Sequence, residues 1–228
     1  MVNRPVQSPS SSVPPLMNGD RLTRHEFERR YAHTDVQAEL IEGTVYMPPA
    51  ALRFRSHAKP HGFLITWLGL YQAFTPGVEL GIEPTVRLDL DNEFQPDGVL
   101  LIAGGQAKLT SDDYIEGPPE LVVEIAASSV AIDLYAKKNA YRRNGVQEYI
   151  VWQAFENKLN WFYLEEGNYG LAEPDAAGVI KSRVFPGLWL AVAALQQGQM
   201  QTVLTTAQQG IAAPEHQAFV QRLGQPEI

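Results

Sequence analysis

The chain has 228 residues, of which 45% are hydrophobic and 19% are charged, and its formal net charge is −8. This length and composition predict one globular domain with decorations, not two full domains. Disulfides, zinc–thiolate sites and thiol catalysis are excluded because the chain contains no cysteine. The negative charge disfavours nonspecific coating of nucleic acid, which needs many lysine and arginine contacts to phosphate, but it allows an enzyme with a local basic strip.

The first 18 residues are rich in serine and proline and predict a disordered tail. They lack the apolar segment of a signal peptide, and no stretch of the chain approaches the roughly 20 apolar residues of a membrane span. We therefore expect a cytoplasmic protein without a membrane partner. Residues 19–190 are expected to form the main domain, and residues 191–228 a helical extension.

The first part of the chain predicts a helix, a hairpin and a second helix. Leu22–Tyr31 has the pattern of a short helix, and Ala38–Met47 that of a hairpin with Gly43 at the turn. Pro60 suits the first position of a helix that continues through His61–Tyr71. This second helix is apolar on most sides, so we expect it to be buried.

Three strands and a helix are predicted next. Thr85–Leu90 alternates between apolar and polar residues, whereas Val99–Ile102 and Leu121–Ala126 are almost continuously apolar. A long loop separates the last two strands, and a helix is expected over about Val130–Arg143.

The remainder of the chain predicts further strands and two amphipathic helices. Glu148–Gln153 and Leu159–Leu164 are expected strands, and Val184–Leu190 a further extended segment. One helix begins near Val192 and another covers Pro214–Leu223. The order of elements predicts an α/β domain with a central mixed sheet flanked by helices.

Two carboxylates lie in segments that otherwise predict buried strands. Asp97 comes directly before the Val99–Ile102 run, and Glu124 lies at the centre of Leu121–Ala126. A buried carboxylate is costly unless a metal, a lysine or a hydrogen-bond network compensates it. If the two strands are neighbours, Asp97 and Glu124 can converge. Such a pair suits a hard cation such as Mg²⁺, which promotes phosphodiester hydrolysis.

The helix after Glu124 carries two lysines on the face that should point inward. Leu134, Lys137, Lys138 and Tyr141 recur at spacings of three and four residues. At least one lysine head is therefore expected near the acids, although this spacing does not separate Lys137 from Lys138. The alternative is an exposed ion pair between Lys137 and Asp133, worth a few tenths of a kcal/mol, with Glu124 as a structural acid.

Two histidines four residues apart, His57 and His61, would suit a metal if both lay on one helix. Because Pro60 stands between them, we expect His57 to lie outside the helix. A capping or loop-ordering role is therefore favoured for the pair, with His61 a candidate to line a cleft.

Two small groups of basic residues are candidates for phosphate contacts. One is the loop that holds Arg53, Arg55 and Lys59, and the other is the pair Arg142 and Arg143 at the end of a helix. For the second pair, an interaction with the helix dipole is an equal alternative.

The chain resembles the Uma-type (DUF820-like) family of restriction endonucleases within the PD-(D/E)XK nuclease superfamily. The resemblance covers about Leu22 to Leu190 and rests on the order and spacing of several blocks. These blocks are AELIEGTVYM, Pro96-Asp97 with the apolar run after it, PPELVVEIAASS, DLYAKKNAYRRNGVQEYIVW and VFPGLWL. The resemblance implies a restriction-endonuclease-like core and a Mg²⁺-dependent (or Mn²⁺-dependent) endonuclease that acts on DNA.

The resemblance also implies roles for individual residues. Asp97 and Glu124 would be metal ligands, and Glu39 a third acid at the edge of the site. In the superfamily motif a lysine stands two residues after the second acid, where this chain has Ala126. The lysine is expected to have moved to the following helix, where matching positions favours Lys137.

A rival interpretation is a catalytically inactive domain that keeps the nuclease fold as a binding or assembly module. The acidic balance and the missing strand lysine favour it. A further departure from the family pattern is Gln153, where an acid is frequent. The aromatic-rich sheet is expected to offer a surface for a homodimer.

Overall fold

The computed structural model describes residues 13–49 and 51–224. Its central sheet has six strands in the order β12-β11-β10-β9-β6-β3. Their bounds are Val78–Ile82 (β3), Gly98–Ile102 (β6), Leu121–Ala126 (β9), Glu148–Gln153 (β10), Lys158–Glu165 (β11) and Asn168–Leu171 (β12). β9 and β10 are parallel and the other neighbours are antiparallel, so the predicted mixed sheet is confirmed.

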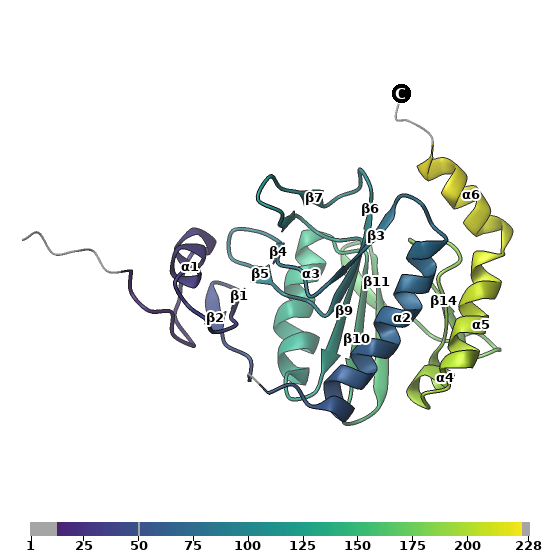
Figure 1. The fold of residues 1–228 in the computed structure, drawn as a ribbon, viewed down its shortest axis with the longest axis horizontal. Coiled ribbons are helices and arrows are strands. Elements are labelled where there is room, and N and C mark those ends of the chain that lie inside the picture. Colours follow the sequence, from purple (N-terminus) through teal and green to yellow (C-terminus); the bar gives the residue numbers. More distant parts are fainter. Residues whose placement is uncertain (1–12, 50, 225–228) are drawn as a thin grey trace, which may run out of the picture.

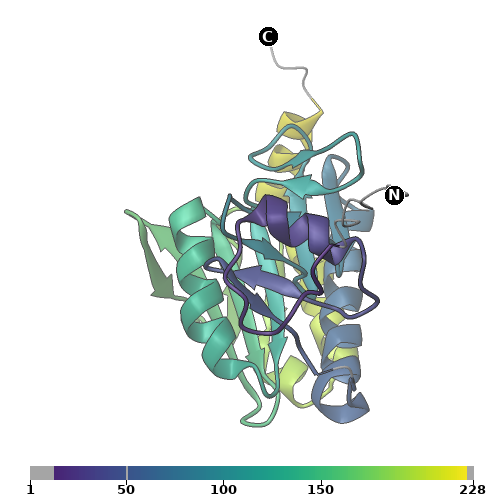
Figure 2. The ribbon, with the colours of Figure 1, turned by 90° about the vertical axis from the view of Figure 1, so that its left-hand side faces the viewer.

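Helices cover both faces of this sheet, as Figures 1 and 2 show. α2 (Lys59–Ala73) and α5 (Met200–Ile211) lie on one face, and the helical segment between β9 and β10 lies on the other. Every residue of β9 and β10 is buried, which explains why both strands have few polar residues. The α/β class predicted from the order of elements is thereby confirmed.

The helical segment between β9 and β10 changes its winding along its length. It begins as a π-helix, η2 (Ile132–Lys137), and continues as α3 (Lys138–Asn144). Gly145 ends it at φ +87°, a left-handed conformation that glycine adopts without strain. The expected helix over Val130–Arg143 is therefore present, with a π-helical first half that its spacing did not predict.

A second six-stranded sheet has the order β2-β1-β5-β4-β8-β7. Its strands are Glu39–Ile41 (β1), Thr44–Tyr46 (β2), Val86–Arg87 (β4), Glu93–Phe94 (β5), Lys108–Leu109 (β7) and Ile115–Glu116 (β8). The hairpin expected around Gly43 is β1–β2. The expected strand Thr85–Leu90 is reduced to β4, because the backbone of Leu88 turns to bond Asn92 and leaves Leu90 75% exposed.

Ordered structure begins closer to the N-terminus than we expected. Residues 1–12 of the predicted disordered tail lie outside the described residues. Leu16, which we also assigned to that tail, is buried beside Phe27 and Leu40. Phe27 belongs to α1 (Arg24–Tyr31), whose first turn is capped by the hydroxyl of Thr23. The ordered domain thus begins before residue 19.

The C-terminal elements share the main core. They are β13 (Val179–Lys181), β14 (Trp189–Ala191), α4 (Val192–Gln196), α5 and α6 (Pro214–Leu223). Val203 and Phe219 from this region are buried in the same cluster as Trp67 of α2. The extended segment predicted over Val184–Leu190 is wrong for most of its length: only its last two residues belong to β14, and a loop precedes them.

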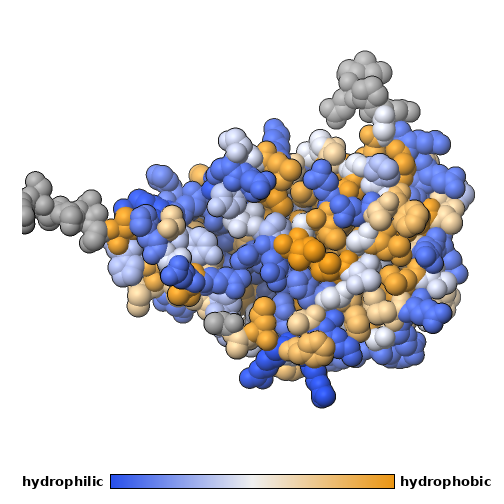
Figure 3. Space-filling model, viewed as in Figure 1, coloured by the Kyte–Doolittle hydropathy of each residue, from blue (hydrophilic) through white to orange (hydrophobic). Residues whose placement is uncertain are grey.

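The surface does not present the aromatic sheet to a partner. Trp152 of β10 and Trp161 of β11 are buried, because helices cover the sheet faces. Figure 3 shows apolar side chains more often over the half with α2 and α5 than over the half with α1, interspersed with polar ones. The sheet faces therefore do not supply the dimer surface that we expected from them. No helix in the described part of the chain is both long and apolar enough to span a membrane.

Candidate active site

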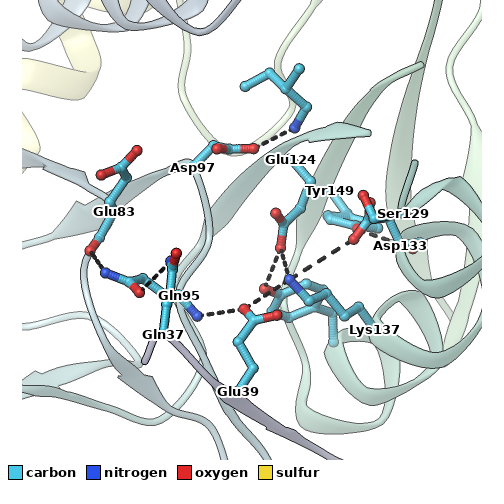
Figure 4. A network of polar contacts seen from close by, with 12 residues as sticks. Gln37, Glu39, Glu83, Gln95, Asp97, Glu124, Ser129, Asp133, Lys137 and Tyr149 are labelled. Carbon is cyan, nitrogen blue, oxygen red and sulfur yellow. Dashed lines mark hydrogen bonds and ion pairs between the residues drawn. The ribbon is translucent and has the colours of Figure 1, made fainter. Parts of the chain in front are cut away.

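Asp97 and Glu124 face each other across two neighbouring strands. β6 and β9 pair antiparallel, with Gly98 opposite Val123, so Asp97 stands opposite Glu124 one step further along. Oδ2 of Asp97 accepts a 2.5 Å hydrogen bond from the backbone amide of Ile125, which fixes the carboxylate beside β9. The structure thus brings together the two acids that strand alternation placed on one face (Figure 4).

Lys137, at the end of the π-helix η2, points into this pair of acids. Its Nζ donates to Oε1 of Glu124 at 3.0 Å and to Oε1 of Glu39 at 2.9 Å. Lys138 turns away, and its Nζ lies 3.7 Å from the centre of the Phe162 ring. The tertiary structure therefore separates the two lysines that helical spacing could not.

Glu39 reaches the site from the other sheet. It is the first residue of β1, and its Oε1 also accepts a 2.8 Å hydrogen bond from the backbone amide of Gln95. Gln95 follows β5, which pairs with β1, so the second sheet holds the third acid against the first (Figure 4). Glu39 is 5% exposed, which makes it an inner member of the site and not an edge residue.

Asp133 is a fourth acid, which the sequence analysis considered only as an exposed partner of Lys137. Its Oδ1 lies 3.9 Å from Nζ of Lys137, and its Oδ2 accepts a 2.6 Å hydrogen bond from Ser129. Both Asp133 and Lys137 are buried, so the alternative of an exposed ion pair between them is wrong. Its position one helical turn before Lys137 was a signal that it shares the inward face.

The buried charges of the site do not balance. Three carboxylates, those of Glu39, Glu124 and Asp133, lie within 4 Å of Nζ of Lys137. Burial raises the pKa of Glu124 well above its usual range, with Lys137 opposing the shift. Burial alone would lower the pKa of Lys137, but the neighbouring carboxylates raise it well above its usual range. Burial raises the pKa of Asp133 to about 6. Because burial makes it costly to ionise these carboxylates together, a bound cation would stabilise their charged forms.

Two buried tyrosines pack beside the acids. The hydroxyl of Tyr141 donates to Oε1 of Glu124 at 3.1 Å, and that of Tyr149 donates to the backbone carbonyl of Asp133 at 3.0 Å. Both rings are fully buried and lie 4.9 Å apart between their centres. They fix the acids and the π-helix relative to the sheet.

A cavity of about 540 Å³ opens above the acids. One wall is the π-helical turn η1 (Phe54–Ala58) and the residue before it, which contribute His57 and Arg53. The exposed ring of Phe155 lines the cavity as well. A substrate group can therefore reach the acids from solvent past an arginine and an aromatic side chain.

The other basic candidates lie apart from this cavity. Arg55 and Lys59 line a smaller hollow beside Trp152. Arg142 donates to the backbone carbonyl of Gly167 at 2.7 Å, and Arg143 forms an exposed ion pair with the carboxylate of Glu42. Arg142 and Arg143 therefore contact other residues of the same chain in this structure.

His57 lies outside α2, as we expected from Pro60, but in the π-helical turn η1 and not in an irregular loop. The turn η1 runs directly into α2, and Pro60 sits in the first turn of α2. Nε2 of His57 lies 2.9 Å from Oδ1 of Asp97, and His57, His61 and Asp97 offer ligand atoms within 4.8 Å of one another.

The two departures from the family motif have structural counterparts. Ala126 is buried two residues after Glu124, so the strand offers no lysine there. Lys137 approaches Glu124 from the helix instead. Gln153 donates to Oδ1 of Asn160 at 2.6 Å in a buried pair on β10 and β11.

The donor set fits a hard divalent cation. Asp97, Glu124 and Glu39 present carboxylate oxygens, the ligands that Mg²⁺ and Mn²⁺ favour. The lysine contacts of Glu39 and Glu124 involve only Oε1 of each. Among the described residues nothing donates to their Oε2 atoms, which stay available to an ion.

Comparison with known proteins gives a family match and a similar fold. Residues 24–193 match the Uma2 family model, described as "Putative restriction endonuclease". A solved structure titled as a putative nuclease belonging to DUF820 from Anabaena variabilis ATCC 29413 is similar, with a TM-score of 0.55 and 14% sequence identity. The match covers 74% of this chain and 96% of that one. At this identity the likeness concerns the fold alone. No curated protein matches the chain.

Proposed function

Since the chain belongs to the Uma2 family of restriction-endonuclease-like proteins, we propose that it is a metal-dependent endonuclease that hydrolyses phosphodiester bonds in DNA. The observation that supports this most is the contact of Lys137 with Glu124 and Glu39 beside Asp97, beneath an open cavity. An isolated ion pair would not need a third acid from a second sheet.

Asp97 and Glu124 are the proposed ligands of a Mg²⁺ or Mn²⁺ ion, with Glu39 assisting through the ion or a water. When bound, such an ion acidifies a water and stabilises charge on the scissile phosphate. Asp97 is held for this task by the amide of Ile125, and Glu124 by Tyr141 and Lys137.

Lys137 acts as a fixed positive charge in this proposal. Its raised pKa keeps it protonated at neutral pH, so it is unsuited to remove a proton from water. An ammonium group has three N–H donors, and Glu39 and Glu124 occupy two of them. The third can hold the attacking water or a phosphate oxygen, where the charge develops.

A homodimer on DNA is a second part of the proposal. Each chain carries one such site, and two copies of the chain on one duplex could cut both strands in a single binding event. Sedimentation of the protein with and without a duplex oligonucleotide tests this, because a complex that cuts both strands while holding a single protein chain would contradict it.

The direct test is cleavage of plasmid, single-stranded DNA and RNA with Mg²⁺ or Mn²⁺. We expect activity on DNA that EDTA abolishes, and a loss of at least about 100-fold in Asp97→Asn and Glu124→Gln. Glu165→Gln is the matched control, since Glu165 is exposed and remote. Cleavage by correctly folded Asp97→Asn at the wild-type rate would refute the assignment.

A non-catalytic nuclease-fold module is the alternative. The acidic lining of the cavity, in which Arg53, Lys137 and His57 face several carboxylates, is the observation that favours it. DNA binding that persists without cleavage under any divalent ion would support this alternative over the endonuclease.

A further inference from the structure

We propose that His57, His61 and Asp97 form a second cation site, beside the acids of the proposed catalytic centre, that is selective for borderline divalent transition ions such as Co²⁺, Ni²⁺ and Zn²⁺. The two histidines have no part in the proposed chemistry of Glu124 and Lys137. The site shares only Asp97 with it, and its metal preference can be measured whether or not the protein cuts DNA.

The ligand atoms are already close together. Nε2 of His57 lies 2.9 Å from Oδ1 of Asp97, and the three residues offer ligand atoms within 4.8 Å of one another. Two neighbouring ligands of an octahedral ion bound at about 2.1 Å are about 3 Å apart. An ion can therefore replace the hydrogen between His57 and Asp97 with little movement of either side chain.

The backbone explains why the two rings meet. η1 and α2 form one continuous helical segment that carries both histidines, and their ring centres lie 5.7 Å apart. Nε2 of His61 is also 2.8 Å from the backbone carbonyl of Asp97, so the strand entry and the helix are fixed against each other. The site is thus built on rigid elements.

Two features indicate that this arrangement is not only an ion pair. Nδ1 of His57 is buried, and no described residue offers it a partner. Glu83 has a left-handed backbone at φ +50°, which L residues rarely adopt. This places its Oε1 3.8 Å from Nδ1 of His61, where the carboxylate can complete the site from the solvent side.

The donor types determine the class of ion. Imidazole nitrogen favours Co²⁺, Ni²⁺ and Zn²⁺, whereas Mg²⁺ and Mn²⁺ favour oxygen ligands and water. The acids around Glu124 offer only oxygen. Asp97 therefore stands between an oxygen site that suits Mg²⁺ and a nitrogen-containing site that suits transition ions.

The test is titration of the full chain with Co²⁺, followed by visible absorption, and with Zn²⁺, followed by calorimetry. We expect His57→Ala and His61→Ala each to weaken binding at least tenfold. Glu124→Gln and the exposed-histidine control His25→Ala should leave it within about twofold. Unchanged Co²⁺ and Zn²⁺ affinity in both His57→Ala and His61→Ala would overturn the proposal and leave a structural His57–Asp97 ion pair.

A measurement on the unmodified protein covers the case in which a variant fails to fold. Substoichiometric Zn²⁺, which is diamagnetic and reports direct ligation, should shift or broaden the ring NMR signals of His57 and His61 before those of His25. Equal shifts or broadening of all three would overturn the proposal. Loss of Mg²⁺-dependent cleavage in Glu124→Gln with Co²⁺ binding intact would support both sites, whereas inactive wild-type protein that binds Co²⁺ would contradict only the proposed function.

Discussion

Nζ of Lys137 lies 3.0 Å from Oε1 of Glu124, and both side chains are buried. The contact joins the end of a π-helix to the centre of a parallel strand pair, so it links the two layers of the domain at the point where the acids gather. Removing either partner leaves an uncompensated buried charge, which costs more than the net value of the pair.

Replacing Lys137 by methionine should impair both stability and activity. We expect the free energy of unfolding to fall by roughly 3–5 kcal/mol, because Glu39 and Glu124 lose their shared cation. Cleavage should fall by orders of magnitude. Urea denaturation and a plasmid assay measure the two effects.

Lys138→Met is the matched control, since Lys138 lies one position along and contacts the Phe162 ring. Its loss should cost less than about 1 kcal/mol and leave cleavage nearly unchanged. An equal loss of activity in both variants would show that Lys137 has no special position.

Tyr141→Phe should separate positioning from catalysis. The change removes the 3.1 Å hydrogen bond to Glu124 and keeps the ring packed against Phe94. We expect a destabilisation of about 1–2 kcal/mol and a several-fold increase in the Mg²⁺ concentration needed for half-maximal cleavage, with the maximal rate retained. A rate lost at saturating Mg²⁺ would instead assign Tyr141 to the chemistry.

Divalent ions should stabilise the wild-type protein. An ion that binds only the folded state adds about 2.7 kcal/mol at 100 times its Kd. Thermal unfolding in EDTA and in rising Mg²⁺ should show this increase for wild type. A similar increase in Asp97→Asn would place the ion elsewhere.

The raised pKa of Glu148 predicts that the free energy of unfolding falls as the pH rises. Glu148 is fully buried, and burial raises its pKa to about 7 from a usual 4.5, although Ser182 and two backbone amides oppose the shift. The pKa of Glu148 is higher in the folded state than in the unfolded state. Its contribution to the free energy of unfolding is therefore complete below about pH 4.5 and is lost as the pH rises through about 7. The span of about 2.5 units corresponds to roughly 3 kcal/mol.

Glu148→Gln removes this titration, so the difference in unfolding free energy between wild type and variant should change across pH 4.5–7. Other raised acids titrate in both proteins and cancel in the comparison. A constant difference, measured by urea unfolding at several pH values, would contradict the raised pKa.

Two glycine-to-alanine changes should have opposite effects on the free energy of unfolding. A Cβ at Gly210 of α5 would lie 2.7 Å from the Trp189 ring and would also collide with the carbonyl of Gly187, so Gly210→Ala should cost roughly 1–3 kcal/mol or more. Gly62 of α2 has no atom within 4 Å of its Cβ position, so Gly62→Ala should add roughly 0.5–1 kcal/mol. Thermal unfolding measures both. A tolerated Gly210→Ala would show that α5 packs more loosely on β14.

The sequence by itself determined the strand pattern and the two central acids. Leu121–Ala126 is almost continuously apolar around Glu124 and Asp97 precedes an apolar run, because a strand buried on both faces imposes that local pattern. The same blocks determined the family, which the match over residues 24–193 confirms. Their spacing along the chain is a local property, so it can be read without the fold.

The tertiary structure decided which side chains complete the site. The choice of Lys137 over Lys138 depends on the π-helical start of the helix, and Glu39 enters through pairing in a second sheet. His57 joins Asp97 because η1 continues into α2 through Pro60. These contacts join residues 13 to 98 positions apart or depend on helical winding, and no local periodicity records such relationships.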